Sequence, residues 1–252
     1  MDNRKLKITL ILLCIIVATF IIIFNLKQST SLNQSNFIKN SNVSPRTQND
    51  SANPNSKFVI PNSLLLNIPF TPQAPTANWD QLHNEACEEA NSLMAGAYFK
   101  GMRDTTLKPE YVESEITKLT DWQKEHQGYY LDQTSEEVAT MINSVYSLKT
   151  KLLNNFSAGD LKQELAAGHL VLISENGRLL GNPNYKSPGP LHHMLLIKGF
   201  DKMGFITNDS GTKRGLNYAY DFSTIYNAAG DWDHSSNNID TAKKIAIVVW
   251  KE

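Results

Sequence analysis

Three residue types in this chain could together perform nucleophilic chemistry: a cysteine, a histidine and an aspartate. Cys87 stands near the start of NEACEEANSLMAGAYF (84–99), whose apolar residues recur at helical spacing. A thiol is a strong nucleophile only as the thiolate, and a helix N-terminus lowers a cysteine pKa through its free N–H groups and dipole. A neighbouring imidazolium lowers it further. We expect Asn84 to be the N-cap and Cys87 to lie in the first turn.

One predicted hairpin supplies the histidine and its partner. His193 opens the run HMLLIKGF, the turn DKMG follows, and the next run, GFITND, ends in Asn208 and Asp209. Paired antiparallel strands bring the start of the first beside the end of the second, so Asp209, or alternatively Asn208, is expected to orient the His193 imidazole. Successive side chains of a strand point to opposite faces, so only one of His192 and His193 can serve as the base. We expect His193, with His192 as the alternative.

Attack on a carbonyl also needs donors for the oxyanion that forms. The backbone N–H of Cys87 is one candidate, and a glutamine upstream is the usual second. Gln73 and Gln81 both qualify by residue type. The residues alone do not decide between them.

Two carboxylates follow the cysteine directly. Glu88 and Glu89 favour the helix dipole but oppose formation of a thiolate at Cys87. We therefore expect both to point away from the sulfur, on a solvated face or in hydrogen bonds.

A metal site is not expected from these residues. Cys87, His193 and Asp209 are ligand types, but zinc sites usually show close-spaced ligand pairs, and we find none in the sequence. No cofactor is expected either.

The elements that must position these residues indicate an α+β domain. Helices are expected at 84–99, at 109–126 after Pro109, at 134–147 with the capping box Thr134-x-x-Glu137, and at 157–168. Strand-like runs follow: HLVLIS, HHMLLIKGF, GFITND and KKIAIVVWK. Helices first and strands later favour helices packed on an antiparallel sheet. The loop LLGNPNYKSPGPL precedes His193 and could form a cleft wall, and Trp232 could pack as a lid.

The N-terminal part has a different composition. Residues 1–7 are a basic tail, and 8–24 are an uninterrupted apolar run of about 26 Å as a helix, enough to approach the span of a bilayer core. We expect an uncleaved signal-anchor with a cytoplasmic N-terminus and an extracytoplasmic domain; a cleaved signal peptide is the alternative. Residues 25–57 are an Asn/Ser/Gln-rich linker expected to be disordered.

Residues 58–252 form the expected globular domain. It carries 17 Lys and Arg against 23 Asp and Glu, a net charge of −6, which gives no basic excess for binding nucleic acid. The other cysteine of the chain, Cys14, lies in the apolar run, so Cys87 is the single cysteine of this domain. We expect the domain to be a monomer whose partner is a peptide or protein substrate.

Several segments together resemble a known family. IPFTPQAP, NEACEEA, PGPLHHMLLIKGFD and ITNDSGTKRG are similar to the exported bacterial branch of the papain-like cysteine peptidases related to the bacteriocin-processing (double-glycine leader) family. The similarity covers nearly all of 58–252 in the right order. The matched positions are Pro69, Phe70, Gln73, Cys87, His193, Gly199, Phe200, Asp201, Asn208 and Asp209. Many relatives have Cys-Gly-Pro where this chain has Cys-Glu-Glu, a run that the compared branch shares.

The resemblance implies a papain-like α+β fold and a triad of Cys87, His193 and Asp209, with Gln73 as oxyanion donor. Gln81 stays a rival because it precedes the cysteine by the spacing seen in papain-like enzymes. The implied activity is hydrolysis of peptide bonds by an extracytoplasmic, membrane-anchored cysteine peptidase. The alternatives are a catalytically silent peptide-binding domain on the same scaffold and a papain-like cell-wall amidase or acyl transferase.

Overall fold

The computed structural model describes residues 60–252. The predicted basic tail, membrane anchor and linker lie outside the described residues. Within 60–252, no helix combines the length and the apolar character needed to cross a bilayer.

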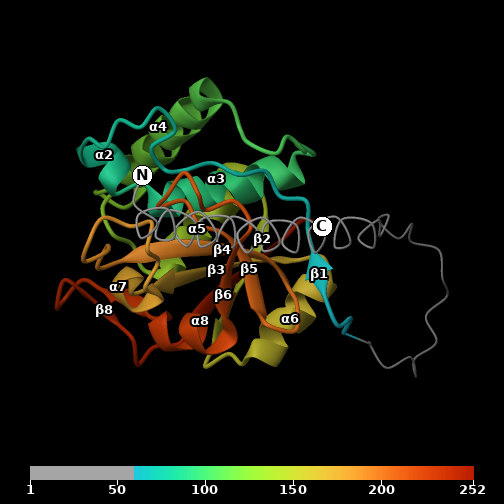
Figure 1. Ribbon diagram of the computed structural model, residues 1–252. Helices are drawn as coiled ribbons and strands as arrows, with labels where there is room; N and C mark the ends of the chain where they lie inside the picture. The colour runs from blue at the N-terminus through green and yellow to red at the C-terminus, as the bar shows by residue number, and fades with distance from the viewer. Residues whose placement is uncertain (1–59) are drawn as a thin grey trace, which may run out of the picture. The chain divides into compact units, whose positions relative to one another are not determined.

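An antiparallel sheet of seven strands forms the centre of the described domain (Figure 1). Six strands run in the spatial order β2-β9-β3-β4-β5-β6, and β1 pairs with the end of β4. Their bounds are β1 Leu64–Leu65, β2 Lys149–Asn154, β3 Leu170–Glu175, β4 His193–Phe200, β5 Gly204–Asn208, β6 Tyr218–Asp221 and β9 Ile245–Trp250. A separate two-stranded hairpin contains β7 (Asp231–Asp233) and β8 (Asn238–Asp240). At Gly199 of β4 a Cβ atom would lie 2.2 Å from the Leu64 carbonyl oxygen, so only glycine lets β1 approach.

Helices cover both faces of the sheet (Figure 1). One face carries α3 (Cys87–Phe99), α4 (Pro109–His126) and α5 (Ser135–Tyr146), and the other carries α6 (Ala158–Ala166), α7 (Gly177–Leu180) and α8 (Phe222–Ala228). The strands alternate accordingly: Leu172 and Leu196 pack with α3–α5, whereas Val171 and Leu195 pack with α6–α8. The expected α+β class, with helices on an antiparallel sheet, is confirmed.

Most local predictions are confirmed, including α4, the capping box of α5 and the DKMG turn between β4 and β5. The prediction that Asn84 caps the cysteine helix is wrong. Asn84 ends a separate short helix, α2 (Gln81–Asn84), and its side-chain amide donates to the carbonyls of Trp79 and Asp80. The N-cap of α3 is Ala86, which makes Cys87 the first residue of the helix.

Candidate active site

Cys87 is buried at the start of α3, with 4% of its surface exposed. Its sulfur lies 2.9 Å from Oε2 of Glu88 and donates a hydrogen bond to it. We expected both glutamates to point away from the sulfur, on a solvated face or in hydrogen bonds. For Glu88 the expected direction is wrong, because its carboxylate accepts the hydrogen bond from the sulfur. Neither glutamate lies on a solvated face, since both are 1% exposed. The reason is packing, because α3 lies between the sheet and its neighbouring helices and its first turn has no solvated side.

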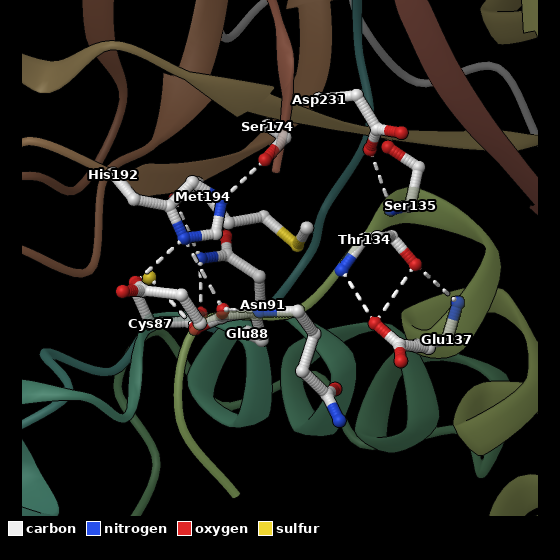
Figure 2. A network of polar contacts seen from close by, with 12 residues as sticks. Cys87, Glu88, Asn91, Thr134, Ser135, Glu137, Ser174, His192, Met194 and Asp231 are labelled. Atoms are coloured by element: carbon white, nitrogen blue, oxygen red, sulfur yellow. Dashed lines mark hydrogen bonds and ion pairs between the residues drawn. The ribbon is translucent and has the colours of Figure 1, made fainter. Parts of the chain in front are cut away.

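Glu88 belongs to a polar network that reaches His192, the residue before β4 (Figure 2). Its Oε1 accepts from the backbone N–H of Gln133 at 3.0 Å and lies 3.4 Å from His192 Nδ1. The same Nδ1 lies 2.8 Å from Asp132 Oδ1, and His192 Nε2 contacts the Ser174 hydroxyl. Both ring nitrogens of His192 therefore have partners.

The Trp232 side chain packs against this network. It is 3% exposed, and its ring lies 5.3 Å from the His192 ring, centroid to centroid. The buried Trp232 ring therefore packs beside the His192 ring in the interior of the domain.

Burial and like charge keep the Cys87 thiol protonated at rest. Burial raises the pKa of Cys87 well above its usual value, and the nearby Glu88 carboxylate raises it further. Burial also raises the pKa of Glu88. Burial would lower the pKa of His192, but the hydrogen bond to Asp132 and the charge of Glu88 outweigh it and raise that pKa.

The hairpin of β4 and β5 brings His193 and Asp209 together, with Nε2 and Oδ1 2.9 Å apart. Asp209 is fully buried. Its Oδ2 accepts hydrogen bonds from the hydroxyls of Tyr185 (2.7 Å) and Tyr220 (2.6 Å) and from the amide of Asn182 (2.8 Å). Burial would raise the pKa of Asp209, but the charge and hydrogen bond of His193, together with the tyrosine hydroxyls, lower it. The carboxylate is thus held ionised.

The two histidines differ in what their rings leave available. Within residues 60–252, His193 has no hydrogen bond to its Nδ1, whereas both nitrogens of His192 are engaged. The His193 ring is also confined: a Cβ at Gly211 would lie 2.9 Å from its Cε1. His193 therefore has one nitrogen held by a carboxylate and the other available for proton transfer.

The candidate oxyanion glutamines have different surroundings. Gln73 is buried, and its amide nitrogen donates to the carbonyls of His83 (2.9 Å) and Asn84 (3.2 Å). Its backbone N–H donates to the Ser210 carbonyl, which joins it to the turn after Asp209. Gln81 is exposed on α2.

Asn208, the alternate orienter, is directed elsewhere. Its amide donates to the carbonyl of Pro69 at 3.0 Å, with the Ile68 carbonyl at 3.5 Å. It therefore fastens the end of β5 to the segment that leads to Gln73, while Asp209 takes the imidazole.

A cleft of about 840 Å³ joins these groups. Cys87, His192, His193 and Gln73 all line it, and one wall is formed by 184–190, part of the loop that we expected to serve as a wall. The remaining lining includes Trp79, Gly211 and two lysines, Lys186 and Lys213.

Sequence reasoning missed five polar residues of the site: Asp132, Ser174, Asn182, Tyr185 and Tyr220. Each belongs to a different loop or strand from the residue it supports. No local pattern marks such a residue, because only the tertiary fold brings it to its partner.

Two of the three comparisons with known proteins found a match. No curated protein sequence matches the chain. A crystal structure from Bacillus anthracis, described provisionally as a C39-like peptidase, is 16% identical, with 75% of this chain and 98% of that chain covered and a TM-score of 0.47. The family model described as "Peptidase_C39 like family" matches residues 65–239, which include Cys87, His193 and Asp209. The chain therefore belongs to the Peptidase_C39 like family.

Proposed function

We propose that the chain is a cysteine peptidase that hydrolyses peptide bonds, with Cys87 as nucleophile, His193 as general base and acid, and Asp209 as the orienting carboxylate. The observation that carries the proposal is the 2.9 Å contact between His193 and Asp209, which leaves the imidazole Nδ1 available. His193 lines the same cleft as Cys87. Family membership supports a peptide as the substrate.

The proposed reaction begins with a proton transfer. The Cys87 thiol first exchanges its hydrogen bond to Glu88 for one to Nδ1 of His193, which takes the proton as sulfur attacks the carbonyl carbon. Asp209 stabilises the imidazolium. His193 then protonates the leaving amine, and a thioester to Cys87 remains. Water, deprotonated by His193, hydrolyses that thioester and returns the thiol.

The oxyanion would be stabilised by two N–H donors. As the first residue of α3, Cys87 has a backbone N–H with no partner inside the helix. Gln73 is the second donor that we propose, because it lines the cleft, whereas Gln81 is exposed on α2. To serve, the Gln73 amide must give up the longer of its two bonds, the 3.2 Å contact to Asn84.

We propose further that residues 8–24 anchor the enzyme in the membrane, with the catalytic domain extracytoplasmic. The support is the basic tail followed by the apolar run. Protease protection of sealed vesicles tests the orientation: the domain should be digested only from the extracytoplasmic side.

The test of the activity combines hydrolysis with thiol labelling. A peptide panel is incubated with wild type, Cys87→Ala, His193→Gln and Asp209→Asn. We expect cleavage by wild type, loss in Cys87→Ala, and an acyl-enzyme on Cys87 that mass spectrometry detects. A panel that includes cell-wall peptides and amine acceptors separates hydrolysis from amidase or acyl-transfer activity. Intact peptides and no acyl-enzyme would contradict the proposal.

A second candidate function is a silent peptide-binding domain. The observation that favours it is the buried Cys87 thiol, bonded to Glu88 and with a raised pKa, which resembles a resting thiol more than an activated one. In that case peptides bind the cleft equally well in wild type and Cys87→Ala, and neither protein cleaves them.

A further inference from the structure

Four metal-ligating side chains converge at the start of α3. The Cys87 sulfur, a carboxylate oxygen of Glu88 and a ring nitrogen of His192 lie within 4.8 Å of one another. A fourth donor, Oδ1 of Asp132, lies 2.8 Å from His192 Nδ1. These are four different side chains from three parts of the chain: the first turn of α3, the segment before α5, and the residue before β4.

Two protons now hold these donors together. The thiol proton of Cys87 faces Oε2 of Glu88 at 2.9 Å, and the Nδ1 proton of His192 faces Oδ1 of Asp132 at 2.8 Å and Oε1 of Glu88 at 3.4 Å. Among the described residues, His192 is the one cationic partner of Glu88 and of Asp132. The cluster therefore brings four electron-pair donors together, with the His192 ring as the one cationic group among them.

The donor set is one that zinc favours. Thiolate, imidazole and carboxylate bind Zn²⁺ with bond lengths of about 2.0–2.3 Å in tetrahedral geometry. Such bonds place the ligand atoms about 3.3–3.8 Å apart, so the present separations need only small side-chain shifts. Mg²⁺ and Ca²⁺ prefer oxygen ligands and fit poorly.

The groups that hold the ligands in place, and the path from solvent, also favour a metal site. His192 Nε2 contacts the Ser174 hydroxyl, which fixes the ring with Nδ1 directed at the cluster (Figure 2). The Gln133 N–H orients the Glu88 carboxylate. Cys87 and His192 both line the cleft, which gives an ion a path from solvent.

We propose that Cys87, Glu88, His192 and Asp132 form a zinc-binding site that blocks the nucleophile. Zn²⁺ bonds to Sγ, to a Glu88 oxygen, to Nδ1 and to Asp132 Oδ1, and it displaces the thiol proton and the Nδ1 proton to solvent. The bond to the ion withdraws charge from the sulfur and makes it a weaker nucleophile. Zinc binding does not depend on hydrolysis, whereas the block of the nucleophile rests on the proposed function of Cys87.

The experiment uses the full chain with Cys14→Ser, so that Cys87 is its single thiol. Iodoacetamide alkylation of Cys87 is followed with and without micromolar ZnCl₂. Co²⁺ titration reports thiolate ligation through a near-ultraviolet charge-transfer band. We expect zinc to slow alkylation at least tenfold, and His192→Gln and Glu88→Gln to weaken the protection at least tenfold. Asp132→Asn, at a side chain 30% exposed, supplies a second variant whose folding is less sensitive.

Two matched variants identify which histidine is the ligand. His193→Gln and the exposed His126→Gln should bind Zn²⁺ and Co²⁺ as wild type does. The same proteins are melted with and without zinc, so a variant that fails to fold is recognised and set aside in favour of Asp132→Asn. Loss of protection in His193→Gln but not in His192→Gln would overturn the proposal in favour of a Cys87–His193 zinc bridge. Unprotected Cys87 in wild type would overturn it altogether.

Discussion

The Cys87 thiol donates its hydrogen bond to its sequence neighbour Glu88, at 2.9 Å. Among the described residues it bonds to neither of the two histidines that line the same cleft. A resting thiol held by a carboxylate must change partner before it can attack. His193 has a ring nitrogen without a hydrogen bond among the described residues, whereas both ring nitrogens of His192 have partners. This difference leads to a kinetic prediction.

His193→Gln should reduce the peptide-cleavage kcat by about 10²–10⁴-fold, because the ring with the available nitrogen is lost. His192→Gln should reduce kcat by less than about tenfold, because both nitrogens of that ring already have partners and a glutamine can keep one of those contacts. Steady-state kinetics on one cleaved peptide, with circular dichroism as the folding check, compares the two. Equal losses would mean that His192 takes part in proton transfer.

Asp209 should make stability depend on acid pH. The pKa of Asp209 in the folded chain lies below the ordinary value. Its contribution to the free energy of unfolding is therefore fully present above about pH 3.9, the pKa of an aspartate in the unfolded chain. That contribution is lost as the pH falls from there through the lowered pKa of the folded chain. Asp209→Asn should therefore flatten the loss of stability in this range. At pH 7 the free energy of unfolding of the Asp209→Asn variant should be about 1–3 kcal/mol lower than that of wild type, because three hydrogen-bond donors lose their carboxylate acceptor.

Urea unfolding at pH 7 and pH 3, followed by tryptophan fluorescence, measures both effects. Tyr220→Phe is the matched control: it removes one donor to Asp209 and should flatten the acid dependence only in part. Parallel pH curves for wild type and Asp209→Asn would show that the acid loss arises elsewhere.

The pair of His193 and Asp209 could be predicted from sequence because one short hairpin contains both residues. The turn DKMG fixes which strand ends meet, and antiparallel pairing of the two strands then places Asp209 beside His193. The α+β class followed for a similar reason, since runs of period 3.6 precede runs of strand character. Local patterns suffice when the residues of interest are close in sequence.

The direction of Glu88 could not be predicted in this way. A glutamate in the first turn of a helix is usually solvated, and the periodicity of α3 does not reveal that nearly the whole helix is buried. The partners that make burial tolerable, Gln133 and His192, are 45 and 104 positions away. The error at Asn84 has a different, local cause: its side chain donates to the carbonyls of Trp79 and Asp80, just before α2, and does not cap α3.

Gln73 and Gln81 should be separable by kinetics. Gln73→Ala should lower kcat by about 10²–10³-fold if its amide stabilises the oxyanion, with the alkylation rate of Cys87 unchanged, because the resting thiol does not contact it. Gln81→Ala, at an exposed position, should leave kcat within about twofold. The opposite pattern would transfer the oxyanion role to Gln81.

Gly211 should be needed for the position of His193. A Cβ there would lie 2.9 Å from Cε1 of His193 and 2.9 Å from Cε1 of Tyr185, closer than real contacts allow, so one ring must move. The Gly211 N–H also donates to Asp209 Oδ1 at 3.1 Å. Because a displacement of about 1 Å at a catalytic group can cost about 10²-fold in rate, we expect Gly211→Ala to lower kcat by up to that factor while KM changes little.

The matched control is Gly181→Ala. Gly181 has a positive φ (62°), and no atom lies within 4 Å of the position that a Cβ would take. It should lower the free energy of unfolding by about 1–2 kcal/mol through backbone strain and leave kcat unchanged. Melting temperature and kcat are measured on both variants. If Gly211→Ala loses stability and keeps its kcat, the His193 ring has room that the structure does not indicate, and its position depends on Asp209 alone.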